Sequence, residues 1–531
     1  MALLRSSGTE STVWHVGRRR FLAGALALGG SHLAPALIRR AGAQPKLAGS
    51  PFTLGVASGY PSPNGVVLWT RLAPTPSAPG GGMPPDAVPV EWEVATDDRM
   101  SQVVQKGVVS ATSAWAHAIH VEVDRLEPAR WYWYRFRAAG EVSAIGRTRT
   151  APAADADSDR LRLAFASCQQ FEQGYFVAYR HMLKDDLDLI IHVGDYIYES
   201  SWGSNHVRAH GAGEPKTLDE YRVRHALYKS DADLQAAHAS HPWLCTWDDH
   251  EVQNDYANDR SEHLDPPDWF LGRRAAAYRA YYEHMPLPSR MAPHGPSMRI
   301  YTRVGFGRLA DIVLVDDRQY RSHQPCAAPG RGGANVVEDC QERLDPRITM
   351  FGEQQEQWLT DELGRSGARW NLVAQQTLMA QLDRNPGPGQ RFWTDGWDGY
   401  PAARRRLLES IGQRKPSNPV VLGGDVHSFW VTDLKPDFDD PRSPVVATEF
   451  VGTSITSQFR RPQSEVDALL ADNPHIRFGN GTRRGYVRME ITRERLRADL
   501  RTMRSVSQRS TEADTLATFV VEDGRPGAVR A

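Results

Sequence analysis

Four short apolar runs, far apart in the chain, each end in side chains that can bind a metal ion. The runs lie within Leu161–Gln170, Leu187–Glu199, Trp243–Glu251 and Pro419–Trp430. Runs of aliphatic and β-branched residues between turn signals are typical of buried strands. In open α/β sheets, ligands bind at the carboxyl ends of the strands. The sequence therefore predicts that these four ends meet and form a metal-centred site.

The remaining pattern divides the chain into two regions. Residues 50–150 carry short alternating runs between Gly, Pro and Asp turns, which predicts an all-β sandwich of immunoglobulin or fibronectin type. Residues 160–531 alternate strands with helix-like segments, for example a helix over Tyr175–Lys184 and another over Glu353–Leu363. Gly485–Met503 predicts an antiparallel strand pair that closes the sheet. We therefore expect an α/β (α+β) catalytic domain after the sandwich.

Long polar or Gly/Pro-rich insertions interrupt the second region. They are Ser201–Leu218, Asn258–Asp268, Ser322–Val337 and Gln381–Trp397. Loops of this length inside a compact domain are usually functional. We expect them to form the walls of a substrate site.

The N-terminus has the features of an export signal. Arg18 and Arg19 precede a weakly apolar stretch, and a small-x-small site ends at Ala43. This predicts a twin-arginine signal over residues 1–43, recognised by the twin-arginine export machinery and cleaved near Ala43. The alternative is an uncleaved anchor, which the interruption at Pro35 disfavours. The mature chain is then periplasmic or secreted, with no stable membrane span.

Charge and cysteine content limit the partners. The formal net charge is −1 with mixed signs throughout, so no basic surface indicates a nucleic-acid partner. Cys326 and Cys340 lie in one Pro/Gly-rich loop and can either pair in an oxidising compartment or remain free. Cys245 is interpreted as a buried thiol, whereas Cys168 follows a strand and is a candidate ligand.

Two pairs of candidate ligands have suitable spacing. Asp195 and Tyr198 lie three residues apart after a strand, so one turn can aim both at one ion. Asp425 and His427 are two apart on an extended segment and share a face. A Tyr198 phenolate beside a Cys168 thiolate favours a redox metal, ferric iron rather than zinc or calcium, and oxygen donors suit calcium or manganese. The candidate ligands are Cys168, Asp195, Tyr198, Asp248, Asp249, Asn254, Asp425 and His427.

Three motifs resemble those of the PhoD-type alkaline phosphatases in the metallophosphoesterase superfamily. They are Gly194-Asp195-x-x-Tyr198, Trp247-Asp248-Asp249-His250-Glu251 and Gly424-Asp425-Val426-His427. Cys168 stands where many metallophosphoesterases have their first Asp, as in the PhoD branch. The resemblance implies a metallophosphoesterase-like β-sandwich core flanked by helices, with a ferric ion and one or two calcium ions as cofactors.

Roles for individual residues follow from the chemistry of two-metal hydrolysis. Asp195 is the expected bridge between ions, and a metal-bound hydroxide would attack the phosphorus in line. Arg318 is expected to clamp the phosphate as a bidentate donor, and His250 to contact the substrate and protonate the leaving alcohol. Either Asp248 or Asp249 could be the dominant ligand.

Several neighbours have a structural interpretation. His192 is more typical of a core histidine than of a ligand. Asp316 and Asp317 could cap a strand end or orient Arg318. Glu199 and Glu251 are interpreted as partners of the ligands or as surface carboxylates.

Three functions remain open at this point. The leading hypothesis is an exported, metal-dependent alkaline phosphatase that acts on small phosphate monoesters. The second uses the same site on phosphodiesters, such as phospholipid or teichoic-acid-like polymers, in the manner of a phosphodiesterase or phospholipase D. The third is a non-catalytic exported binding protein, which a ligand set of this kind disfavours.

Overall fold

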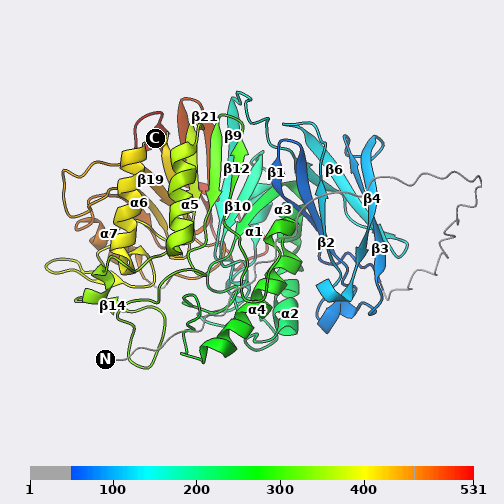
Figure 1. The fold of residues 1–531 in the computed structure, drawn as a ribbon, viewed down its shortest axis with the longest axis horizontal. Helices are drawn as coiled ribbons and strands as arrows, with labels where there is room; N and C mark the ends of the chain where they lie inside the picture. Colours follow the sequence, from blue (N-terminus) through cyan, green and yellow to red (C-terminus); the bar gives the residue numbers. More distant parts are fainter. Residues whose placement is uncertain (1–48, 460) are drawn as a thin grey trace, which may run out of the picture. The chain divides into compact units, whose positions relative to one another are not determined.

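The computed structural model describes residues 49–459 and 461–531, so the predicted signal over residues 1–43 lies outside it. Within this part, a ten-stranded mixed sheet contains the first three predicted strands (Figure 1). Its strands, in spatial order, are β24 (Val529–Arg530), β23 (Ala513–Glu522), β22 (Arg495–Met503), β21 (Arg484–Thr492), β9 (Arg160–Ala166), β10 (Leu189–Val193), β11 (Pro242–Thr246), β1 (Val56–Ser62), β2 (Gly65–Arg71) and β5 (Ala118–Val123). β21 and β22 are the predicted antiparallel pair, and β21 continues onto β9.

A seven-stranded sheet contains the fourth predicted strand, β17. Its spatial order is β12 (Thr302–Phe306), β13 (Ala310–Leu314), β15 (Trp370–Ala374), β17 (Pro419–Gly423), β19 (Ala447–Val451), β18 (Phe429–Leu434) and β20 (Ile476–Asn480). The four strands from β13 to β19 are parallel, and antiparallel strands flank them. Parallel strands buried on both faces read as continuous apolar runs, which explains why β15 and β17 are buried throughout.

Alternation along these strands separates two apolar cores. Ile312, Leu372 and Leu422 pack in one core with the side chains of the ten-stranded sheet. Their neighbours Val313, Val373 and Val421 pack in a second core with helices α5 (Gly352–Arg365), α6 (Pro401–Arg414) and α7 (Gln463–Leu470). Because successive side chains of a strand point to opposite faces, the seven-stranded sheet is covered by a sheet on one side and by helices on the other.

Further helices pack on the ten-stranded sheet. They are α1 (Val177–Met182), α2 (Leu218–Lys229), α3 (Ala232–Ser240) and α4 (Pro267–His284). Trp243 on β11 packs against Tyr179 of α1 with the two rings tilted, and it donates its indole N–H to the Ala237 carbonyl of α3. A capping box begins α2: the Thr217 hydroxyl accepts the Glu220 backbone N–H, and the Glu220 carboxylate accepts the Thr217 N–H.

The N-terminal region shares a sheet with the rest. Strands β3 (Val88–Ala95), β4 (Val103–Ala111), β6 (Trp131–Ala138), β7 (Glu141–Val142) and β8 (Gly146–Arg149) form a five-stranded sheet. It packs against β1, β2 and β5, with Leu68, Val90 and Phe136 in a common core. Because β1 also pairs in parallel with β11, this sandwich is continuous with the large sheet rather than separated from it.

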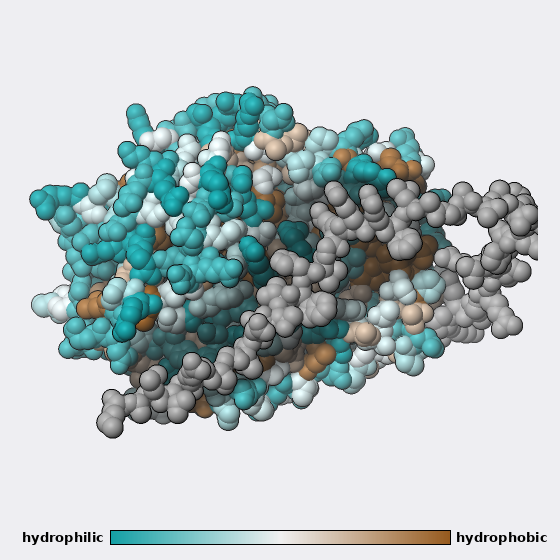
Figure 2. Space-filling view, viewed as in Figure 1, coloured by the Kyte–Doolittle hydropathy of each residue, from teal (hydrophilic) through white to brown (hydrophobic). Residues whose placement is uncertain are grey.

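The remaining strands and the surface complete the fold. β14 (Val336–Val337) and β16 (Phe392–Trp393) pair as a short ribbon between two insertions. No helix in residues 49–459 and 461–531 is long and apolar enough to cross a membrane. Hydrophilic side chains predominate in Figure 2 where α5 and α6 lie in Figure 1, as expected for helices that bury only one stripe.

Candidate metal centre

The ends of the four predicted strands meet at one edge of the two sheets. The Cys168 backbone N–H donates to the Gly194 carbonyl (3.1 Å), which joins the ends of β9 and β10. Ser167 forms an isolated parallel bridge with Ser454, which joins the end of β9 to the segment after β19. The Gly452 N–H donates to Gly423 at the end of β17 (2.9 Å). These contacts connect the two sheets at their carboxyl ends, where the candidate ligands lie.

The candidate ligand residues lie in sharp turns with left-handed backbone conformation next to their strands. Cys168, Asp195, Asp425 and His427 have φ values of 60°, 56°, 63° and 54°. Non-glycine residues rarely adopt this conformation, and it clusters at functional sites. Gly194 (φ 111°) must be glycine, because a Cβ there would lie 2.5 Å from the Asp248 Cβ. The strained turns therefore allow side chains from different strands to converge.

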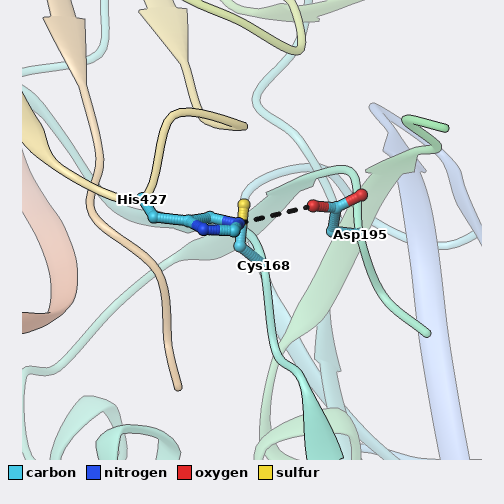
Figure 3. Close-up of side chains that lie close together, drawn as sticks. All are labelled: Cys168, Asp195 and His427. Carbon is cyan, nitrogen blue, oxygen red and sulfur yellow. Dashed lines mark ion pairs between the residues drawn. The ribbon is translucent and has the colours of Figure 1, made fainter. Parts of the chain in front are cut away.

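One cluster joins sulfur, imidazole, carboxylate and phenol. Ligand atoms of Cys168, Asp195 and His427 all lie within 4.8 Å of one another (Figure 3). The Tyr198 hydroxyl is 2.8 Å from Asp195 Oδ2 and 3.1 Å from His427 Nε2. The four side chains therefore lie close together at the ends of their strands.

Neighbouring groups orient this cluster. His427 Nδ1–H donates to the Gln458 carbonyl (3.0 Å), which leaves Nε2 facing the other ligands. The Trp202 ring stacks on the His427 ring at a centroid distance of 5.5 Å. Ser457 donates its hydroxyl hydrogen to the Tyr198 oxygen (2.8 Å). The donor atoms are thus held in place by the protein alone.

Electrostatics show what the cluster requires. Burial and the nearby Asp195 carboxylate raise the pKa of the Cys168 thiol well above its usual value. The same two causes raise the pKa of the Tyr198 phenol. A thiolate and a phenolate are therefore stable here only beside a cation.

Two more clusters extend from the first. Asp195, Asp249 and His250 form one, and Asp249, Asp255 and Asp395 form the other, each with ligand atoms within 4.8 Å of one another. Asp195 and Asp249 each belong to two clusters, so their carboxylates are shared. Asp255 and Asp395 were not among the predicted ligands, because neither follows a long apolar run in the sequence.

Unpartnered oxygens support cation binding. Asp195 Oδ1, Asp248 Oδ2 and Asp249 Oδ1 are buried and accept no hydrogen bond in the described part of the chain. Buried polar atoms without partners are rare, since each loses its hydration without compensation. Burial and neighbouring carboxylates also raise the pKa values of Asp195 and Asp425 well above the ordinary range. The donor set therefore fits bound cations, which would stabilise the ionised forms.

Two glutamates hold the ligand segments, as one of their predicted interpretations stated. Glu251 accepts the backbone N–H groups of Asp195 (3.2 Å), Tyr196 (2.6 Å) and Asp248 (2.9 Å). Glu199 accepts His250 Nδ1–H (2.6 Å) and the Asn254 backbone N–H (2.9 Å). Both glutamates are buried, so they are partners of the ligand segments rather than surface carboxylates.

Burial and charge act in opposite directions on His250. Burial disfavours its charged ring, but the carboxylates of Glu199, Asp249 and Asp195 hold its pKa well above the usual value. His250 also lines a cavity described below. These carboxylates therefore favour the protonated form of the His250 ring at the cavity wall.

Arg318 is more deeply buried than a residue that binds the substrate phosphate would be. Its side chain is 1% exposed and binds Asp248 (2.5 Å) and Asp395 (2.8 Å), with Asp249 at 3.6 Å. Asp316 accepts the Arg318 backbone N–H (3.0 Å) and so fixes the strand end. Because carboxylates occupy the guanidinium and it does not line the cavity, the geometry does not support Arg318 as a phosphate clamp.

The other candidates take distinct places. Asp249 lines the cavity, whereas Asp248 is turned toward Arg318. Asp425 accepts the Thr377 hydroxyl hydrogen (2.6 Å) and lines the cavity together with Asn254. His192 stays in the core, where its ring packs near Tyr196 and Trp243.

A cavity of about 600 Å³ opens beside the clusters. Every predicted insertion contributes to its wall: Trp202, Glu262, Arg331 and Arg384 come from the four in order. The ribbon of β14 and β16 ties two of these insertions together. A disulfide between Cys326 and Cys340 closes the insertion that carries Arg331.

Comparison with known proteins agrees with this arrangement. The family model for the PhoD-like phosphatase matches residues 163–500, and that for the PhoD-like phosphatase N-terminal domain matches residues 38–152. Alkaline phosphatase D of Bacillus subtilis (strain 168) is 45% identical over 96% of this chain and 88% of its own length. A solved structure titled "Structure of PhoD" superposes with a TM-score of 0.87 at 46% identity, over 92% of this chain and 93% of that one.

These findings define an enzyme that hydrolyses phosphoric esters. The chain belongs to the PhoD-like phosphatase family.

Proposed function

We propose that this protein is an exported, metal-dependent alkaline phosphatase that releases phosphate from small phosphate monoesters. The observation that carries the proposal is the convergence of ligand residues, with three orphaned carboxylate oxygens, beside one open cavity. A non-catalytic binding protein has no need of such a set of ligand residues. Membership of a phosphatase family argues against the hypothesis of a non-catalytic binding protein.

The chemistry of the donor atoms suggests which metal each cluster would bind. Sulfur, phenol and imidazole donors favour ferric iron in the first cluster, and carboxylate and amide oxygens favour one or two calcium ions nearby. The residues proposed for iron are Cys168, Asp195, Tyr198 and His427; those proposed for calcium are Asp249, Asn254, Asp255, Asp395 and Asp425. When bound, such cations lower the pKa of water and neutralise charge on the phosphoryl oxygens.

The chain's own residues supply the remaining steps. Asp195 belongs to two clusters and would contribute its carboxylate to the cations held by each. Arg318 would hold Asp248 in place through its short ion pair. His250, held by Glu199, would donate its proton to the leaving alkoxide oxygen.

Hydrolysis of phosphodiesters is the second candidate. Its support is the apolar part of the cavity wall, formed by Leu382, Phe459, Val466 and Leu469. A diester carries a second organic group, and this wall offers an apolar surface to it. A monoester has no such group beyond its leaving alcohol.

Export is proposed from the twin arginines at Arg18 and Arg19 and from the disulfide Cys326–Cys340. Disulfides persist in oxidising compartments, which agrees with a periplasmic or secreted enzyme cleaved near Ala43. Expression with Arg18 and Arg19 both changed to Lys should retain the protein in the cytoplasm. Export of that variant would exclude the twin-arginine route.

Direct assays test the function. We expect nitrophenyl phosphate to be hydrolysed at alkaline pH, with faster turnover than bis-nitrophenyl phosphate. A strong chelator should abolish activity, and iron with calcium should restore it. A clear preference for the diester would favour the second candidate, and unchanged activity after proven metal removal would reject the metal-dependent mechanism.

A further inference from the structure

Arg384 lines the same cavity as Asp195, Asp249 and Asp425. In the described part of the chain its guanidinium makes no ion pair and no hydrogen bond. The other arginines described in the cavity wall are paired, Arg331 with Glu262 and Arg461 with Glu465 (4.0 Å). Arg384 is therefore the unpaired guanidinium among the described wall residues.

The backbone on both sides of Arg384 is fixed. The Asp383 carboxylate accepts the N–H groups of Asn385 and Arg391, each at 2.9 Å. The Arg384 N–H donates to the Arg391 carbonyl (2.8 Å), which closes the loop. The side-chain amide of Asn473 accepts the Asp383 backbone N–H and donates to the Asp383 carbonyl, each at 2.9 Å. A cationic side chain on a pinned loop loses little freedom when it binds a ligand.

The Trp393 ring supports the guanidinium. The Arg384 Cζ lies 5.0 Å from the ring centroid, a distance that suits a cation–π contact. Burial in the wall, together with the nearby Arg461 cation, lowers the pKa of Arg384 to about 10, and the Asp398 and Asp425 carboxylates oppose that shift only in part. The side chain remains charged at neutral and mildly alkaline pH. A partly buried cation without a direct ion-pair partner is unfavourable, and an anion that enters the cavity and binds it would reduce that penalty.

Arg318 and Arg384 therefore differ in what they can bind. The guanidinium of Arg318 is occupied by Asp248 and Asp395 and lies outside the cavity wall. The guanidinium of Arg384, a cavity-wall residue, forms no ion pair among the described residues, although the carboxylates of Asp398 and Asp425 lie near enough to act on its charge. A planar guanidinium matches two oxygens of a phosphate, which makes arginine suited to this task.

We propose that Arg384 binds the non-bridging phosphate oxygens of the substrate and of the phosphate product, the role that the strand-end pattern assigned to Arg318. This inference rests on the proposed phosphatase function and names the residue that binds the phosphate. A monoester dianion has more charge and one more terminal oxygen than a diester monoanion. Arg384 therefore favours monoesters and inorganic phosphate over diesters.

The test compares Arg384→Gln and Arg384→Lys with the metal-loaded wild-type enzyme. The control is Arg391→Gln, because Arg391 is in the same loop, is exposed, and pairs with Glu338 (3.4 Å) away from the cavity wall. We expect Arg384→Gln to lower kcat/KM for nitrophenyl phosphate roughly 10- to 100-fold, in line with a lost charged hydrogen bond. The inhibition constant of inorganic phosphate should rise at least about tenfold on the same grounds, with a smaller loss on the diester.

The metal content of Arg384→Gln, measured by elemental analysis, should equal that of the wild type. This result separates loss of phosphate binding from loss of metal. Arg384→Lys, which keeps the charge without the planar fork, should fall between wild type and Arg384→Gln. If Arg384→Gln does not fold, the phosphate inhibition constant of Arg384→Lys tests the proposal instead. A wild-type phosphate inhibition constant in a folded Arg384 variant, or an equal loss in Arg391→Gln, overturns the proposal. If the wild type itself hydrolyses no phosphate ester, the proposed function fails instead.

Discussion

His250 donates its Nδ1–H to Oε2 of Glu199 across 2.6 Å, and both side chains are buried beside the cavity. The second Glu199 oxygen accepts the Asn254 backbone N–H, so one carboxylate orients two residues of the site. Since His250 also lines the cavity, this pair would set the direction from which a proton reaches the substrate in the proposed mechanism.

Glu199→Gln should therefore lower kcat by roughly 10- to 100-fold, because the His250 imidazole loses the carboxylate that favours its protonated form. The loss should be larger for an alkyl phosphate than for nitrophenyl phosphate, whose leaving group needs little protonation. The control is Asp259→Asn, which removes the carboxylate of an exposed His323–Asp259 pair (2.7 Å). An equal loss on both substrates would contradict the acid role of His250.

Cys168→Ala should remove a ligand from the first cluster and lower bound iron together with activity. A ferric phenolate absorbs visible light, so the absorption band of the loaded protein should weaken in parallel. Cys245→Ala is the matched control, because Cys245 is also a buried free thiol but does not belong to any of the described clusters. Normal iron content in active Cys168→Ala would exclude the thiolate as a ligand.

The first cluster could be predicted from the ends of the apolar runs, because its position depends only on the local sequence pattern and on the parallel pairing of neighbouring strands. Cys168 and Asp195 follow neighbouring parallel strands, so their convergence requires only that β9 and β10 lie side by side. Asp255 lies in a loop, Asp395 follows only the two-residue strand β16, and packing of these loops brings both residues to Asp249. Long-range packing of this kind leaves no periodic signal in a single sequence.

Burial of charged side chains explains why the sequence analysis misplaced Arg318 and missed helix α4. The sequence shows that Arg318 follows a strand but not that Asp248 and Asp395 reach it from distant segments. Helix α4 was not predicted although it has 18 residues. It buries Arg273, Arg274 and Glu283 among its apolar residues, which removes the apolar stripe that marks a surface helix.

The disulfide also has a predicted effect on the site. The insertion that it closes carries Gly333 and Ala334, and the Ala334 N–H donates to Asp255 Oδ2 (2.9 Å). A Cβ on Gly333 would lie 2.7 Å from the Asp255 Cβ, so this loop packs directly on the third cluster. The bridge therefore helps to hold Asp255.

Changing both Cys326 and Cys340 to Ser should lower the free energy of unfolding by about 3 kcal/mol, as for a loop of this length. The calcium concentration for half-maximal activity should rise several-fold, and saturating calcium should restore most of the rate. Urea unfolding and calcium titration measure the two effects. An unchanged calcium midpoint in the destabilised variant would limit the bridge to stability.

Lys229 is a buried cation away from the described metal clusters. Its ammonium lies over the Trp69 ring at 4.4 Å and has no hydrogen-bond partner among the described residues. Burial lowers its pKa from the ordinary value of 10.5 to about 7. The unfolded chain therefore binds more protons than the folded one between these two pH values, and on this account stability rises as pH rises from about 7 to about 10.5.

Lys229→Met should accordingly stabilise the protein most well below pH 7, where both states of the wild type carry the proton and the penalty of the buried charge is complete. The gain should be on the order of a few kcal/mol and should shrink toward zero near the ordinary lysine pKa. Urea unfolding at a series of pH values measures it. Lys106→Met, at an exposed position of β4, should show no comparable pH-dependent gain. A gain that is independent of pH would mean that Met packs better than Lys without any role for the charge.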